Sequence, residues 1–230
     1  MEEEKFKKIL KEIKSRDKRD AQIDKANRVS LKTTGLKEQK PKKSIEVNTG
    51  KLIGVSNVVK FIKEKLSDKD KIISITGMSG TGKSTTAERL KKELGAVKFS
   101  MGEIFRYLTY LKIKNTKSEI DFKEIIKNMH YKMETDGLNL FDGNLNITKS
   151  LKKELRLAEI DIGVPKTASI TQELVLSFMA KEISQLTKQT SKRIIMEGRE
   201  FTLDFIPSDL RINLVADART RAKRRTAQYH

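Results

Sequence analysis

Hydrophobic residues in this chain alternate between short apolar runs and longer stretches with helical spacing. The short runs are rich in Ile, Val and Phe and are typical of buried strands. They span residues 44–48, 73–76, 97–100, 193–196 and 210–215. Because helical stretches separate them, the pattern predicts an α/β fold with a doubly wound, five-stranded parallel sheet.

The helical stretches carry apolar residues three and four positions apart. They predict helices over residues 2–20, 55–66, 87–94, 103–135, 148–158 and 169–187, with a basic helix after residue 215. Residues 21–43 and 136–147 lack this spacing and are rich in Lys, Asn, Asp or Gly. We therefore expect these two segments to be loops.

The second apolar run leads into the sequence Gly-x-x-x-x-Gly-Lys-Ser, from Gly77 to Ser84, and helical spacing follows at once. A strand, this loop and a helix in succession are typical of a phosphate-binding P-loop, although a glycine turn before an ordinary helix is the alternative. Backbone N–H groups of such a loop bind phosphate oxygens, Lys83 reaches the β- and γ-phosphates, and the Ser84 hydroxyl is placed to bind Mg²⁺. The predicted ATP-binding residues are Gly77, Met78, Ser79, Gly80, Thr81, Gly82, Lys83, Ser84 and Thr85.

The composition limits the class of protein. Among 230 residues, 49 are Lys or Arg and 31 are Asp or Glu, and the net charge of +18 suits nucleotides or nucleic acid, with a generally lysine-rich composition as the alternative. The absence of Trp disfavours stacking on single-stranded nucleic acid. The chain has no Cys, no long apolar run and a charged N-terminus, so we expect a cytoplasmic protein without a membrane span. His130 and His230 have no motif partner and are expected at the surface.

Arginine-bearing segments follow three of the predicted strands. They are Ser100 to Arg106, Glu197 to Glu200, and a basic helix with Arg219, Arg221, Arg224 and Arg225. The carboxyl ends of parallel strands open onto one crevice, where ligands bind. Arginines there favour bidentate capture of a phosphate, although any single one could be a solvated surface residue.

The order of these motifs resembles the cytidylate kinase family of nucleoside monophosphate kinases. The similar pieces are the P-loop, Ser-Met-Gly-Glu-Ile-Phe-Arg, Glu-Gly-Arg-Glu and Ala-Asp-Ala-Arg-Thr-Arg-Ala-Lys-Arg-Arg-Thr-Ala-Gln, within residues 71–230. The resemblance implies a P-loop kinase core, a substrate-binding insertion and an arginine-rich lid. It also implies transfer of the γ-phosphoryl group of ATP to CMP or dCMP with Mg²⁺. A kinase for AMP or UMP, or a non-catalytic P-loop protein that binds nucleic acid, are the alternatives.

The resemblance also assigns roles to individual residues. Those implied to bind the acceptor nucleotide are Met101, Arg106, Arg199, Glu200, Asp20 and Arg28. Those implied to be catalytic are Lys83, Arg16, Arg19 and Arg225. The chain departs from the family in places: Met101 offers the base no hydrogen bond, Glu200 stands where the family has Asp, and Lys181 is only near the place of a substrate-binding arginine.

The N-terminal segment is similar to the end of the same family. Residues 14–20, Lys-Ser-Arg-Asp-Lys-Arg-Asp, resemble its Arg-Asp-x-Arg-Asp lid signature, and the strand and helix over residues 44–66 resemble its last strand and helix. We therefore expect a circular permutation, with the natural ends joined by residues 67–70 and new ends, Met1 and His230, in the lid. The strand at 45–48 should then lie at the sheet edge beside the strand at 210–215. An unrelated basic extension on a truncated kinase is the alternative.

These expectations define one monomeric P-loop kinase domain over residues 1–230. Its predicted parts are the second half of the lid with a loop (1–43), the last strand and helix (44–70), the P-loop core (71–106), the substrate-binding insertion (107–165), further core (166–215) and the first half of the lid (216–230).

Overall fold

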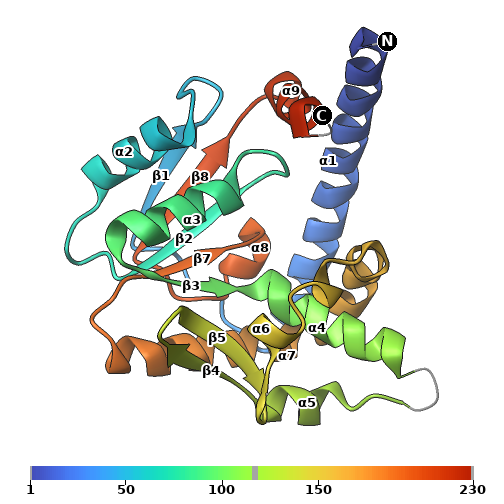
Figure 1. Ribbon diagram of the computed structural model, residues 1–230, viewed down its shortest axis with the longest axis vertical. Helices are drawn as coiled ribbons and strands as arrows, with labels where there is room; N and C mark the ends of the chain where they lie inside the picture. The colour runs from blue at the N-terminus through green and yellow to red at the C-terminus, as the bar shows by residue number, and fades with distance from the viewer. Residues whose placement is uncertain (1, 116–118, 229–230) are drawn as a thin grey trace.

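The computed structural model describes residues 2–115 and 119–228 and contains a five-stranded parallel sheet (Figure 1). The strands lie in the order β1-β8-β2-β7-β3. Their bounds are β1 Lys43–Asn48, β2 Ile72–Gly77, β3 Val97–Ser100, β7 Ile194–Glu197 and β8 Leu210–Val215. They nearly coincide with the five apolar runs, so the predicted α/β fold is confirmed.

Apolar clusters cover both faces of this sheet. On one face, Ile75 and Ile212 pack with side chains of α2 (Val55–Lys65) and α3 (Lys83–Leu94), which lie side by side in Figure 1. On the other face, Phe99 packs with side chains of α4 (Met101–Lys114) and α7 (Ala158–Gln189). Strands covered on both faces need apolar side chains at nearly every position, which explains the largely buried sequences of β2, β7 and β8.

Strand β1 lies parallel to β8 at the edge of the sheet, with Ile45 opposite Ile212 and Asn48 opposite Val215. Its Val47 and the Val58, Val59 and Ile62 side chains of α2 belong to the same core cluster as β2 and β8. The segment 44–66 is therefore part of the folded domain. The prediction that its strand lies at the sheet edge beside the strand at 210–215 is confirmed.

The N-terminal helix is longer than predicted. Helix α1 runs from Glu2 to Thr33, so residues 21–33 are helical and the expectation of a loop from 21 to 43 was wrong there. The apolar stripe that begins with Ile9 and Ile13 is interrupted because the next residues on that face are carboxylates that pair with arginines, and it resumes at Leu31. Because aspartates take the positions where apolar residues would mark a helix, the apolar spacing that predicts helices is not visible in this part of the sequence.

The insertion after α4 contains strands that sequence reasoning missed. Helix α5 (Phe122–Asn128) is followed by an antiparallel sheet of β4 (Met129–Glu134), β5 (Gly137–Asp142) and β6 (Leu145–Asn146). A helix through residue 135 and a loop over 136–147 were therefore wrong predictions, and residues 116–118 lie outside the described part. The Asp-Gly pairs at Gly137 and Gly143, both with positive φ, were the available hairpin signal. His130 is exposed, as expected, and stacks on Phe141.

The segment from residue 147 also differs from its prediction. In place of a helix over 148–158 there are two short turns, α6 (Ile147–Ser150) and a 3₁₀ helix at Glu154–Arg156. Helix α7 then runs over 32 residues and includes Pro165, so it begins well before the predicted residue 169. A proline inside a helix removes one backbone hydrogen bond, and packing of α7 on α4 offsets that loss.

The two remaining helices are α8 (Glu200–Leu203) and α9 (Ala218–Gln228). Helix α9 packs on α1, where Ala222 forms a small apolar cluster with Ile9 and Ile13 (Figure 1). The expected positions of Met1 and His230 concern residues outside the described part. Within the described ranges, no helix has the length and apolar character needed to span a membrane.

Candidate functional site

The loop between β2 and α3 has the backbone conformation of a phosphate-binding loop. Gly77, Gly80 and Gly82 all have positive φ angles. A Cβ at Gly77 would lie 2.3 Å from the Leu214 carbonyl oxygen, so only glycine lets β2 turn this close to β8. Thr81 is buried, and its hydroxyl donates to the Met78 carbonyl at 2.8 Å, which closes the loop. The loop is therefore pre-shaped by its own residues.

Lys83 begins α3 and folds back over this loop. Its Nζ donates to the carbonyl oxygens of Gly77 at 2.7 Å and Met78 at 3.0 Å. Burial lowers the pKa of the Lys83 ammonium, Arg199 and Arg16 lower it further, and Glu197 and Asp20 raise it. A poorly solvated ammonium gains most from a phosphate anion, so Lys83 is placed to bind one. Ser84 and Thr85 are exposed on the first turn of the helix beside it.

Arg199 follows β7 and faces α1. Its Nη2 lies 2.8 Å from an oxygen of Asp20, and its Nη1 lies 3.0 Å from Oδ1 of Asp24. Asp20 also pairs with Arg16 at 3.8 Å. The Gly198 N–H donates to the Ile75 carbonyl oxygen at 3.2 Å, so Arg199 lies beside the strand that enters the P-loop, and ion pairs link it through Asp20 to Arg16.

Met101 and Arg106 lie on the first two turns of α4, which follows β3, the neighbour of β7 in the sheet. Met101 is buried, and its methyl carbon would be 2.9 Å from a Cβ at Gly198, the residue before Arg199. Arg106 donates from Nε at 3.0 Å and from Nη2 at 2.7 Å to one oxygen of Asp161 on α7. Glu200 is exposed at the first position of α8, and its charge acts on Asp24.

Helix α9 supplies arginines to the P-loop. Arg221 is buried and donates to the Ser79 carbonyl oxygen at 3.1 Å, and Arg225 donates to the Ser79 hydroxyl at 3.3 Å. Arg224 donates to the Thr49 hydroxyl at 3.0 Å, and Thr49 in turn donates to the Thr81 carbonyl oxygen at 3.1 Å. The end of β1, helix α9 and the P-loop thus form one connected group.

Not every predicted residue reaches this group. Arg28 pairs with Asp204 at 2.5 Å and with Glu38 at 3.1 Å, which ties α1 to the segment after α8. Arg19 is exposed on α1 and forms no ion pair with any described residue. Lys181 is exposed on α7.

Several carboxylates of the site were missed by sequence reasoning. Asp17 and Asp24 lie three and four residues from Asp20, which was predicted, and this spacing places all three on one face of a helix. That spacing was the available signal, and the prediction of a loop beyond residue 20 obscured it. Asp161 carried no comparable signal, because its partner Arg106 is 55 positions away.

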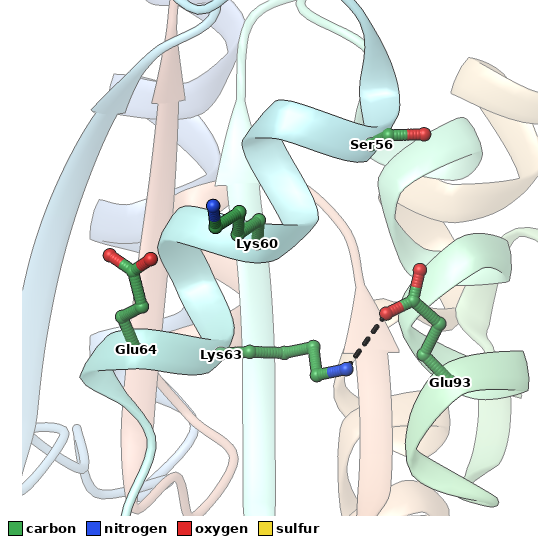
Figure 2. Close-up of a pocket in the computed structure, with 5 residues that line it drawn as sticks. All are labelled: Ser56, Lys60, Lys63, Glu64 and Glu93. Carbon is green, nitrogen blue, oxygen red and sulfur yellow. Dashed lines mark hydrogen bonds and ion pairs between the residues drawn. The ribbon is translucent and has the colours of Figure 1, made fainter.

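A groove between α2 and α3 is separate from this site. This groove, of about 480 Å³, is lined by Ser56, Lys60, Lys63, Glu64 and Glu93, and Lys63 bonds to Glu93 across it at 2.9 Å (Figure 2). Neither a P-loop residue nor a strand-end arginine lines this groove. Among the described residues, no group of three or more His, Cys, Asp or Glu could hold a metal ion by itself.

Comparison with known proteins agrees with this geometry. The sequence model of the family described as cytidylate kinase matches residues 73–230. The cytidylate kinase of Mesomycoplasma hyopneumoniae strain 232 is 33% identical over 162 residues, covering 68% of this chain and 66% of the relative. That of Flavobacterium psychrophilum is 33% identical over 161 residues, covering 66% and 69%. The matches span about two thirds of each relative. The chain belongs to the cytidylate kinase family.

Proposed function

We propose that this protein transfers the γ-phosphoryl group of ATP to CMP or dCMP, giving ADP and CDP or dCDP. The observation that supports the proposal is that Arg199 follows Gly198, whose N–H bonds to Ile75 of the strand entering the P-loop, and that Asp20 pairs with both Arg199 and Arg16. Phosphoryl transfer needs alignment of the two substrates and stabilisation of the charge that develops on the transferred group. Cationic side chains beside a phosphate-binding loop match that requirement.

The donor nucleotide would bind at the P-loop. The loop amides and Lys83 would hold the β- and γ-phosphates, and Arg225 would approach them from α9, where it already bonds to Ser79. Ser84 fits Mg²⁺ because its hydroxyl is exposed on the first helical turn, and Mg²⁺ in such sites is held by few protein ligands and by the phosphates. When bound, Mg²⁺ would neutralise phosphate charge.

The acceptor nucleotide would bind beside the donor, at the ends of β3 and β7. Arg106 and Arg199 would hold its phosphate, since Arg106 lies along the start of α4 near Gly102 and Arg199 follows Gly198, which Met101 approaches. Glu200 would accept a hydrogen bond from the amino group of cytosine, a donor that uracil lacks. Arg16 and Asp20 would complete the site from α1 and exclude water when the nucleotides are bound.

We further propose that the chain is a circular permutant that acts as a monomer, with α1 and α9 as two halves of one lid. Residues 1–72 lie outside the family match, yet α1 pairs with Arg199 and β1 pairs with β8. An unrelated extension would have no reason to supply the edge strand of the sheet and carboxylates to the strand-end arginine. The parts of the domain then follow the boundaries predicted above.

A phosphorylation assay with ATP, Mg²⁺ and a panel of CMP, dCMP, UMP and AMP tests the proposed reaction. We expect the highest kcat/KM with CMP or dCMP. Faster turnover of AMP would refute the acceptor assignment, and no turnover of any monophosphate would favour a non-catalytic P-loop protein.

A further inference from the structure

We propose that Asp161 and Asp24 act as internal substitutes for the acceptor phosphate: they occupy Arg106 and Arg199 in the nucleotide-free protein and thereby set its acceptor affinity. The inference rests on the proposed function, which assigns these two arginines to the acceptor nucleotide.

Asp161 occupies the side of Arg106 that a phosphate would use. Nε and Nη2 form one edge of the guanidinium group, and both donate to a single Asp161 oxygen, at 3.0 and 2.7 Å. This edge is the usual docking side for a carboxylate or a phosphate oxygen. The Asp161 side chain is 55% exposed, so it can rotate into water when a phosphate takes its place.

Asp24 and Asp20 occupy Arg199 in a similar way. Asp20 pairs with Nη2 of Arg199 and Asp24 pairs with Nη1, so each terminal nitrogen of the guanidinium group already has a carboxylate partner. The Oδ1 of Asp24 is buried, and its ion pair with Nη1 of Arg199 does not have hydrogen-bond geometry, so this oxygen accepts no hydrogen bond from any described side chain or backbone group. Burial raises the pKa of the Asp24 carboxyl, and Asp20 and Glu200 raise it further, against the opposing effects of Arg199 and Arg28. The carboxylate at Asp24 is therefore held at an energetic cost.

The two arginines follow neighbouring strands whose ends are paired, with Ser100 of β3 opposite Glu197 of β7. Met101 contacts Gly198, which precedes Arg199, and a Cβ at Gly102 would lie 3.7 Å from Nη1 of Arg106. A phosphate dianion that binds here meets two guanidinium groups whose charge is already balanced by carboxylates. It must displace Asp161 and Asp24, and the free energy of breaking those contacts is subtracted from its binding.

The test is calorimetric titration of CMP into the full chain and into Asp161→Asn, Asp24→Asn and the double variant. Glu173→Gln on α7 and Glu12→Gln on α1 remove one exposed negative charge from the same helices and serve as matched controls. A partly exposed ion pair contributes little, so we expect each Asn variant to bind CMP about two- to fivefold more tightly. The double variant should gain the product of the two factors, and the controls should match the wild type.

Steady-state kinetics separates this effect from a change in the chemical step. The Asn variants should lower KM for CMP and change kcat less, because the carboxylates act on acceptor binding. CMP affinity that stays the same, or falls, in both Asn variants overturns the inference. A wild-type chain that neither binds nor phosphorylates CMP overturns the proposed function itself, which is a distinguishable result.

Discussion

Arg221 of α9 donates hydrogen bonds to both carboxylate oxygens of Asp17 on α1, at 3.0 and 2.6 Å, across 204 positions of the sequence. The same guanidinium group donates to the Ser79 carbonyl oxygen of the P-loop, and only 3% of the Arg221 side chain is exposed. One buried arginine therefore joins the N-terminal helix, the C-terminal helix and the phosphate-binding loop.

Breaking this pair should undock α1. Asp17→Asn leaves the buried Arg221 charge uncompensated, and we expect the free energy of unfolding to fall by about 2–3 kcal/mol. Urea denaturation measures the change, and Lys18→Gln, at an exposed neighbouring position, is the control. A loss no larger than that of the control would mean that α1 is held by its other contacts.

Lys83→Ala should abolish phosphoryl transfer without unfolding the protein. The loop amides remain, but the ammonium that reaches the phosphates is gone, so we expect kcat/KM to fall roughly a hundredfold or more, about 3 kcal/mol of the barrier. Lys92→Ala removes an exposed lysine from the same helix and should be neutral. Near-normal turnover in the Lys83 variant would contradict the P-loop kinase assignment.

Glu200→Gln should weaken the preference for cytosine. A carboxylate only accepts hydrogen bonds, whereas an amide can also donate to the carbonyl oxygen of uracil. We expect the ratio of kcat/KM for CMP over UMP to fall about tenfold or more. No separate control variant is needed, because a general loss of activity would lower kcat/KM for CMP and for UMP alike and leave their ratio unchanged. An unchanged ratio would show that other groups recognise the base.

Asp24→Asn should affect stability in a pH-dependent way. The folded-state pKa of Asp24 is raised, so the group contributes stability below its unfolded pKa and loses it as pH rises through the folded value. The Asn variant, which cannot ionise, should therefore be slightly more stable than the wild type at pH 7. This gain should shrink as pH falls towards 4, in urea titrations at several pH values. A variant less stable at pH 7 would indicate a favourable structural ion pair with Arg199.

The permutation can be tested by reordering the chain. A protein that starts at residue 71, runs to 230 and continues through a short linker into residues 1–66 restores the proposed natural order. It should fold and retain kcat, since the β1–β8 pairing and the α1–α9 contact are unchanged. The matching experiment is deletion of residues 1–70, which should leave β8 as an uncovered edge and abolish activity. A stable, active kinase without residues 1–70 would refute the permutation.

The sheet and the P-loop were predictable from sequence because both depend on local patterns. Strand β2 reads as an apolar run, and the positive φ angles of Gly77 and Gly82 are reflected in a fixed glycine spacing. The second half of α1 was missed because it has no continuous apolar stripe and is stabilised by contacts with arginines far away in the sequence, such as Asp24 with Arg199. The same holds for β4, whose Tyr131 packs on Phe99 and Phe178 from other elements.

The pairing of β1 with β8 has a consequence for biosynthesis. Thr49, at the end of β1, hydrogen-bonds to the Val215 carbonyl oxygen, 166 residues later. During translation, α1 and β1 are made before β8 and α9, the elements on which they pack. A contact between such distant residues slows folding and leaves an unpaired strand exposed meanwhile. The nascent chain must therefore keep α1 and β1 soluble until β8 and α9 have been made, and the catalytic centre assembles only after that.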